Sequence, residues 1–136
     1  MVAAEFLTRP YRVLISDDDE GCRETVREAL AERGYETRMA SCGREAIEVA
    51  RRQLVHVLIV DMNMPDMNGL DTVITIRRET AARVPSILMS ADASRDLMVE
   101  ALTAEFDSFI AKPFDVNALR HIVEELLRRH YEPDDQ

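Results

Sequence analysis

The most constraining feature of the chain is a set of short runs that are almost wholly apolar. They lie at residues 13–15, 57–60, 87–89 and 109–111. Each run has the length of a strand, and none contains the alternating polar residues of a half-exposed strand. Such runs are typical of a parallel sheet that is covered on both faces. The sequence therefore predicts an α/β domain with helices on both sides of one sheet.

The segments between these runs have apolar residues at helical spacing, so strands and helices are expected to alternate. We predict strands at 12–16, 36–40, 56–60, 85–89 and 107–111, each followed by a helix. The strand at 36–40 is the most polar, so we place it at an edge of the sheet.

Gly34 is positioned to end the first helix, because glycine readily takes the left-handed conformation there. Asp19 is well placed to cap the start of that helix. Several apolar residues are expected to point into the core from the helix after 62–68 and from a helix at 94–104: Leu70, Val73, Ile74, Leu97, Met98, Ala101 and Leu102.

The composition limits the class of protein. The 136 residues suffice for one domain, and 46% hydrophobic with 32% charged residues is ordinary for a globular protein. The formal charge of −9 argues against a nucleic-acid surface and against an anionic membrane surface as partner. We divide the chain into an N-terminal extension at 1–10, a domain at 11–130 and a flexible tail at 131–136.

The expected location is the cytoplasm. No apolar run approaches the roughly 18 residues that span a bilayer, and the first ten residues do not resemble a signal peptide. The two cysteines, Cys22 and Cys42, form no CxxC pair, so we interpret them as small packing residues. The three histidines, His56, His121 and His130, share no metal-like spacing and are interpreted as structural or surface residues.

Polar residues stand where the apolar runs end. Asp17 and Asp18 follow the first run, Asp61 follows the second, and Ser90 and Lys112 follow the last two. In an open parallel sheet, ligands bind outside the carboxyl ends of the strands. Three acids gathered there repel one another unless a lysine or a divalent cation lies among them. The sequence thus predicts a site that binds a hard metal and handles a phosphoryl group.

Taken together, five motifs resemble the receiver domains of bacterial response regulators. They are Val-Leu-Ile-Ser-Asp-Asp-Asp at 13–19, Val-Leu-Ile-Val-Asp-Met-Asn-Met-Pro at 57–65, Asn-Gly-Leu at 68–70, Leu-Met-Ser-Ala at 88–91 and Lys-Pro-Phe at 112–114. The resemblance implies a flavodoxin-like fold, a doubly wound five-stranded parallel sheet with strand order 2-1-3-4-5. It also implies a phosphorelay partner, which is a sensor histidine kinase or a phosphotransfer protein.

The resemblance assigns a role to each matching residue. Asp61 would accept the phosphoryl group, and Lys112 would pair with one of its oxygens. Asp18, Asp61 and the backbone carbonyl of Asn63 would bind Mg²⁺, with Asp17 acting mostly through a metal-bound water. The Lys112–Pro113 bond is expected to be cis.

Further roles concern switching and hydrolysis. Ser90 would donate its hydroxyl to the phosphoryl group, and Phe109 would turn inward, although Phe109 could equally be a plain core residue. These two residues would bias a face built from the helix at 94–104, the strand at 107–111 and the last helix. Asn63 and Asp92 would flank the phosphoryl group and tune its hydrolysis.

One departure from the family pattern is Glu105-Phe106, where receivers usually have Gly-Ala. Losing the glycine predicts an altered end for the helix at 94–104. Phe106 adds bulk at the predicted signalling face, so we expect a partner contact there. Met64 is expected to pack beneath the site, while Met62 and Met67 could be partner contacts or gap fillers.

Three other functions remain open at this point. The chain could be a receiver fragment of a larger regulator or hybrid kinase. A flavin-binding flavodoxin-like protein needs a phosphate-cradling loop after its first strand, but here that loop is acidic and would repel phosphate. An aspartyl-nucleophile phosphohydrolase usually has a second acid two residues after its nucleophile, where this chain has Asn63. We therefore expect no enzyme, only self-catalysed phosphorylation and dephosphorylation.

Overall fold

The computed structural model describes residues 10–92 and 94–132 and contains the predicted parallel sheet. The strand order is β2-β1-β3-β4-β5, which confirms the order expected from the resemblance and places β2 at an edge. The strands are β1 (Arg12–Ser16), β2 (Glu36–Ala40), β3 (Val57–Asp61), β4 (Ser86–Ser90) and β5 (Ser108–Ala111). All four strand pairs are parallel.

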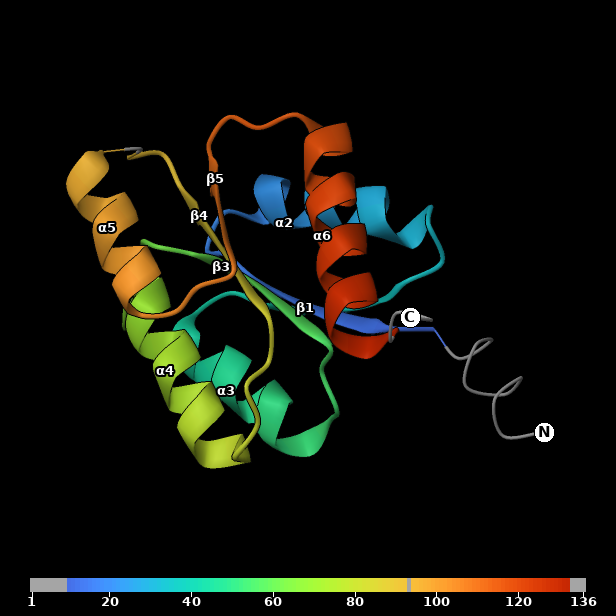
Figure 1. Ribbon diagram of the computed structural model, residues 1–136, viewed down its shortest axis with the longest axis horizontal. Coiled ribbons are helices and arrows are strands. Elements are labelled where there is room, and N and C mark those ends of the chain that lie inside the picture. Colours follow the sequence, from blue (N-terminus) through green and yellow to red (C-terminus); the bar gives the residue numbers. More distant parts are fainter. Residues whose placement is uncertain (1–9, 93, 133–136) are drawn as a thin grey trace.

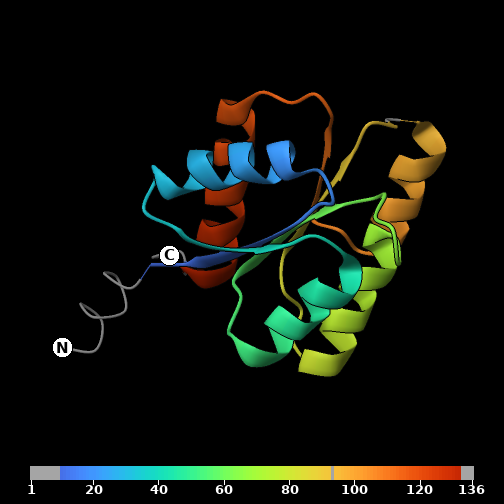
Figure 2. The same ribbon diagram turned by 180° about the vertical axis from the view of Figure 1, so that it is seen from behind.

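Five helices cover both faces of the sheet in the described part of the chain (Figure 1). They are α2 (Glu20–Ala31), α3 (Gly43–Arg52), α4 (Gly69–Thr80), α5 (Arg95–Thr103) and α6 (Val116–Tyr131). Helices α2 and α6 lie on one face, and α3, α4 and α5 lie on the other; both views show this (Figures 1 and 2). None of these helices is long and apolar enough to cross a membrane.

Alternate residues of the central strands fill two separate cores. On β3, Val57 and Ile59 pack with the α2 and α6 side, while Leu58 and Val60 pack with the α3, α4 and α5 side. All of these side chains are fully buried. Because successive side chains of a strand point to opposite faces, a central strand covered on both sides is apolar along most of its length. This is the physical reason for the apolar runs.

The first helix begins and ends as predicted. The Asp19 side chain accepts a hydrogen bond from the Gly21 N–H at the start of α2. At the other end, Gly34 has a φ of 87°, and its N–H donates to the Ala31 carbonyl. The left-handed residue turns the chain sharply toward β2.

Three of the predicted core residues are exposed instead. Ile74 in α4 is 45% exposed, and Met98 and Leu102 in α5 are 43% and 72% exposed. Of the predicted set in α5, only Leu97 and Ala101 are buried. Helix α5 covers the sheet near the edge strand β5, so only a narrow stripe of its surface meets the core. The prediction for Met98 and Leu102 was wrong for this reason. The prediction for Ile74 was also wrong, because this residue of α4 is nearly half exposed.

The predictions for Glu105 and Phe106 were also wrong. Glu105 adopts the left-handed conformation without being glycine, with a φ of 65°. Its N–H donates to the Leu102 carbonyl and the Phe106 N–H donates to the Ala101 carbonyl, each at 3.0 Å, so α5 ends in a Schellman motif. This turn directs Phe106 into the core, where it is 6% exposed and unable to offer a partner contact.

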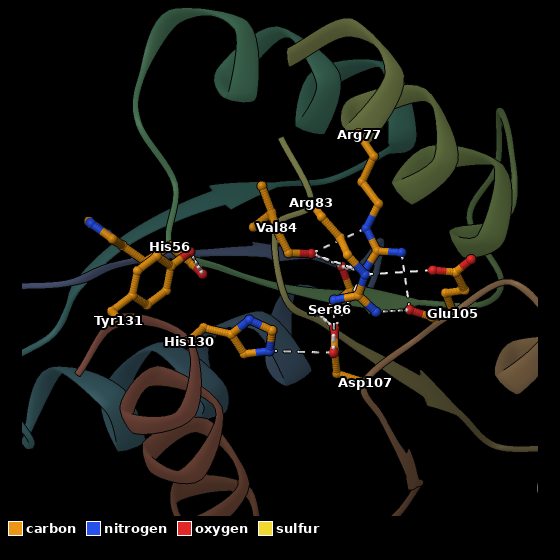
Figure 3. A network of polar contacts seen from close by, with 9 residues as sticks. All are labelled: His56, Arg77, Arg83, Val84, Ser86, Glu105, Asp107, His130 and Tyr131. Atoms are coloured by element: carbon orange, nitrogen blue, oxygen red, sulfur yellow. Dashed lines mark hydrogen bonds and ion pairs between the residues drawn. The ribbon is translucent and has the colours of Figure 1, made fainter. Parts of the chain in front are cut away.

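Two arginines hold the Glu105 backbone in place (Figure 3). Arg77 Nη1 and Arg83 Nη2 donate to the Glu105 carbonyl at 3.1 and 2.9 Å. Arg83 also pairs with Asp107 at 3.1 Å, and the Asp107 carboxylate accepts the Ser86 N–H at 2.8 Å. This network lies at the amino ends of β4 and β5, opposite the end where the predicted site residues stand. Its hydrogen bonds to the Glu105 carbonyl offset the steric cost of the left-handed conformation that Glu105 adopts in place of glycine.

Tyr131, the first residue of the predicted flexible tail, is instead the last residue of α6. Its hydroxyl donates to the His56 carbonyl at 2.8 Å, and its ring lies edge-on to the His56 ring. His56 Nδ1 in turn accepts the Arg12 N–H at 2.9 Å, so this histidine has the structural role expected of it. Residues 1–9 and 133–136 of the predicted extension and tail lie outside the described residues.

The left-handed conformation of Glu105 leads to a stability prediction. Replacing Glu105 by glycine removes the steric cost of this conformation, so Glu105→Gly should be more stable than Glu105→Ala by about 1 kcal/mol. Both variants lose the exposed side-chain pairing with Arg83, so their comparison isolates the backbone effect. Urea denaturation measures the difference. If Glu105→Ala were as stable as Glu105→Gly, the left-handed conformation of residue 105 would carry no steric cost.

Candidate functional site

The carboxyl edge of the sheet brings the predicted polar residues together. Asp17 and Asp18 directly follow β1, Asp61 is the last residue of β3, and Ser90 is the last residue of β4. Lys112 directly follows β5. The sequence prediction ended β3 and β4 one residue earlier. In the structure, Asp61 and Ser90 are therefore themselves the last residues of these strands. Asp61 is in register with Met89, which places the phosphoacceptor candidate beside the end of β4.

The three acids converge. One carboxylate oxygen each from Asp17, Asp18 and Asp61 lie within 4.8 Å of one another. Asp17 is fully buried and Asp61 is 6% exposed, whereas Asp18 is exposed. Hard oxygen ligands at this spacing, one of them open to solvent, fit Mg²⁺, which binds oxygen at about 2.1 Å and keeps several waters. The donor set therefore fits the metal that the resemblance implies.

Lys112 lies among these acids and bridges two of them. Its Nζ is 2.7 Å from Asp17 Oδ2 and 3.5 Å from Asp61 Oδ1. The other oxygen of Asp17, Oδ1, accepts the Asp19 N–H at 2.9 Å. Asp17 thus has a hydrogen-bond partner on each oxygen, while its role toward a metal stays a prediction.

This arrangement separates the pKa values of the two buried acids. Burial opposes ionisation of Asp17, but the hydrogen bond from Lys112 and the Asp19 N–H outweigh it and lower its pKa. Burial, and then the charge of Asp17, raise the pKa of Asp61 to about 6. Burial works against the positive charge of Lys112, but its bond to Asp17 leaves its pKa raised. At neutral pH the site holds an ionised Asp17–Lys112 pair beside a destabilised Asp61 carboxylate.

The remaining predicted residues surround this cluster. Ser90 is fully buried, and its hydroxyl oxygen accepts the Asp92 N–H at 3.0 Å. The side chains of Asn63 and Asp92 are exposed, and Asp92 accepts the Ser94 N–H. Phe109 is half-buried and packs against the core on the α3, α4 and α5 side. The roles assigned to these four residues stay predictions.

Two other expectations are confirmed at this edge. The Lys112–Pro113 bond is cis. Met64 packs beneath the site, with its sulfur 3.0 Å from the Ser16 hydroxyl oxygen. Met62 and Met67 are half-buried against the core on the α3, α4 and α5 side of the sheet, which favours gap filling over partner contact.

Sequence reasoning missed the part that Cys22 plays beside the site. Its thiol forms a hydrogen bond with Asp17. Burial, followed by this bond to an ionised carboxylate, raises the pKa of Cys22 to about 12. The thiol therefore stays protonated at neutral pH, and a protonated thiol is a poor nucleophile. The only signal in the sequence was its spacing of five residues from Asp17.

Gly69 has a role that the motif alone did not explain. A Cβ atom at this position would lie 2.6 Å from the Asp61 carbonyl oxygen. The first turn of α4 therefore packs directly on the backbone of the phosphoacceptor candidate, and only glycine leaves room for it. The Asn68 side chain caps the same helix by accepting the Asp71 N–H.

The fold and the site together define a class of protein. A doubly wound parallel sheet with an acidic cluster and a lysine at its carboxyl edge is a flavodoxin-like domain with its polar groups where such folds bind their ligands. The sequence profile of the response regulator receiver domain matches residues 13–124. The chain therefore belongs to the response regulator receiver family of two-component systems.

Curated proteins and solved structures agree with this assignment. The probable transcriptional regulatory protein TcrX of Mycobacterium tuberculosis is 35% identical over 121 residues, which cover 89% of this chain and 51% of that protein. The regulatory protein AtoC of Escherichia coli is 34% identical over 122 residues, covering 90% of this chain and 26% of that protein. The chain thus spans about half of the first relative and about a quarter of the second.

Among solved structures, the chemotaxis protein CheY4 of Vibrio cholerae superposes with a TM-score of 0.83 at 28% identity. The match covers 88% of this chain and 100% of that chain. The described fold is therefore that of a whole receiver domain.

The raised pKa of Asp61 leads to a prediction about stability and pH. The folded state binds this proton more tightly than the unfolded chain does, so ionisation of Asp61 costs stability increasingly from about pH 4 and fully above pH 6. In EDTA, Asp61→Asn should raise the free energy of unfolding by roughly 1–3 kcal/mol at pH 7.5, and by less as the pH falls from 6 to 4.

Thermal or urea denaturation at several pH values measures this difference. Asp92→Asn, which neutralises an exposed acid of the same edge, is the control and should change stability little. Equal gains for both variants, or a gain that does not depend on pH, would contradict the burial of an uncompensated charge at Asp61.

Proposed function

We propose that this chain is a phosphoacceptor receiver that takes a phosphoryl group from a histidine kinase or a phosphotransfer protein onto Asp61. One observation carries the proposal: a nearly buried carboxylate at the end of β3 lies between a lysine ammonium, 3.5 Å away, and two further carboxylates. A purely structural ion pair needs one acid for one lysine. Here the acids exceed the lysine, which is the arrangement expected where a cation and a phosphoryl group bind.

In this proposal an oxygen of Asp61 attacks the phosphorus of a phosphohistidine. The O–P bond forms as the N–P bond breaks, and the neutral imidazole leaves with a proton from solvent. Lys112 pairs with a phosphoryl oxygen and stabilises the negative charge that arrives with it. The hydroxyl of Ser90 donates to another oxygen once Asp61 is modified.

Asp18, Asp61 and the Asn63 carbonyl would hold Mg²⁺, with Asp17 acting through a metal-bound water. When bound, the ion offsets the charge of the acids, so that a dianionic phosphoryl group can approach. Asp17 contributes in a second way. Its ion pair holds the Lys112 ammonium near Asp61, from where the ammonium can move to pair with the phosphoryl group.

The output surface in this proposal is the face formed by α5, β5 and α6. Addition of the phosphoryl group would draw Ser90 toward Asp61 and let Phe109 turn inward, which changes this face. Met98 and Leu102, exposed on α5, supply apolar area for a partner. We assign the partner contact to these two residues and no longer to Phe106, which is buried.

The wider context of the domain follows from its length relative to known regulators. Because the chain spans about half or less of TcrX and AtoC, the output of those proteins does not transfer to it. The chain acts alone on a protein partner, or it is the receiver part of a larger regulator or hybrid kinase. In either case we propose no enzymatic turnover beyond gain and loss of its own phosphoryl group, in the cytoplasm.

The direct test is intact-protein mass spectrometry after incubation with acetyl phosphate and Mg²⁺. The parent should gain one phosphoryl mass, because Asp61 is the nucleophile and the small donor replaces the kinase. Asp61→Asn should gain none, and EDTA should abolish the gain in the parent. Asp96→Asn, which neutralises an exposed acid of α5 outside the metal cluster, is the matched control and should still be phosphorylated.

Phosphorylation of Asp61→Asn to the level of the parent would refute the assignment of the site. Multiple turnovers of common phosphoesters would instead favour the aspartyl phosphohydrolase. A bound yellow chromophore in the purified protein would favour the flavin binder, which the acidic loop after β1 disfavours.

The two exposed residues that flank the site lead to a prediction about phosphoryl lifetime. If Asn63 and Asp92 help to orient the attacking water, Asn63→Leu and Asp92→Leu should each lengthen the half-life of phosphorylated Asp61 by about 2- to 10-fold. The half-life is measured by mass spectrometry after removal of the donor. Asp96→Leu, which changes an exposed acid on α5, is the control. An unchanged half-life in both variants would defeat the assignment.

A further inference from the structure

The start of helix α3 differs from the starts of the other described helices. The residues before α2, α4, α5 and α6 each cap their helix with a side-chain oxygen; these residues are Asp19, Asn68, Ser94 and Asp115. Cys42, the residue before α3, makes no such bond. A helix leaves its first N–H groups without partners inside the helix, so another group must satisfy them.

That group is Asp66, which comes from a different part of the chain. Its Oδ1 accepts the Gly43 N–H at 2.9 Å, and its Oδ2 accepts the Arg44 N–H at 2.8 Å. Oδ1 also accepts the N–H of its own neighbour, Met67, at 2.9 Å. Slight desolvation opposes ionisation, but the N–H groups of Arg44 and Gly43 keep the pKa of Asp66 low. A charged carboxylate at a helix N-terminus also interacts favourably with the helix dipole.

Asp66 lies on the loop 62–68, between β3 and α4, which carries the predicted metal ligand Asn63. The loop and α3 also pack closely at a second point. A Cβ atom on Gly43 would collide with Met67 Cγ and lie 2.6 Å from Thr72 Oγ1. The start of α3, the loop and the first turn of α4 therefore form one closely packed unit.

The chain around the start of α3 also contacts the end of β1 and Asp17, which follows it. The Asp17 N–H donates to the Ala40 carbonyl at 3.0 Å. The Ser16 hydroxyl lies between the Cys42 carbonyl, at 3.4 Å, and Met64 Sδ, at 3.0 Å. Residues 40–44 thus connect the end of β1, which bears Asp17, to the loop that follows Asp61.

We propose that Asp66 is a positioning residue: it anchors the loop 62–68 to the start of α3 and so holds the Asn63 carbonyl in place for Mg²⁺. This inference rests on the proposed function of the site. Asp66 itself touches neither the metal cluster nor Lys112. Without the anchor the loop samples more conformations, and the entropy of ordering it then opposes Mg²⁺ binding.

The test compares Asp66→Ala with Asp115→Ala. Asp115 caps α6 through the Asn117 N–H at 3.1 Å, so its loss removes an aspartate cap without touching the loop 62–68. The Mg²⁺ dissociation constant is measured by NMR titration at pH 7.5. Asp66→Ala should raise it by about 10-fold, the lower end of the roughly 10- to 100-fold loss typical of groups that orient metal ligands. Asp115→Ala should stay within about twofold of the parent.

The rate of phosphorylation by acetyl phosphate gives a second measurement. For Asp66→Ala, the Mg²⁺ concentration at half-maximal rate should rise, while the rate at saturating Mg²⁺ should return close to that of the parent. A general loss of folded protein would lower the maximal rate instead. Asp66→Asn keeps one oxygen acceptor and should lie between the parent and Asp66→Ala.

The outcomes separate this inference from the proposed function. If the parent neither binds Mg²⁺ nor becomes phosphorylated, the proposed function fails. If the parent does both and Asp66→Ala matches Asp115→Ala, Asp66 is only a helix cap and the positioning role is refuted. If Asp66→Ala does not fold, Asp66→Asn takes its place, and an Mg²⁺ dissociation constant equal to that of the parent refutes the role.

Discussion

The structure depends on placing two buried carboxylates side by side with one lysine. Asp17 directly follows β1, Asp61 ends the neighbouring β3, and Lys112 reaches both from just after β5. Removing charges from water is costly unless they are paired. One ammonium can fully compensate only one of the acids, and the shorter distance shows that this acid is Asp17. Asp61 keeps a pKa raised to about 6, because burial and the charge of Asp17 outweigh the more distant ammonium of Lys112.

The sequence predicted the sheet well because burial on both faces leaves a strong pattern. The apolar runs identified the central strands, the more polar 36–40 run identified an edge, and Gly34 identified the end of α2. The carboxyl-edge rule then placed Asp17, Asp61 and Lys112 together. The positions of these residues are therefore well predicted, although their chemical roles still rest on the resemblance.

The sequence failed where the answer depends on contacts between distant residues. Helical spacing shows that Met98 and Leu102 share a side of α5, but not that α5 lies over an edge strand with little core to cover. Glu105 could take a glycine's conformation because Arg77 and Arg83 bind its carbonyl, from more than twenty residues away in sequence. Asp66 caps a helix that precedes it by 23 residues, and no local pattern indicates such a cap.

The energy of the proposed switch can be judged from a single hydrogen bond. In the described state the Ser90 hydroxyl oxygen accepts the Asp92 N–H. Movement of Ser90 toward a modified Asp61 would give up this neutral bond, worth about 0.5–1.5 kcal/mol, for a bond to a charged oxygen, worth about 1.5–3 kcal/mol. The difference of about 1 kcal/mol is enough to shift a population several-fold but not to invert a strongly biased equilibrium. In the proposed mechanism, the pairing of Lys112 with the phosphoryl group would add to this shift, because Lys112 already lies 3.5 Å from Asp61.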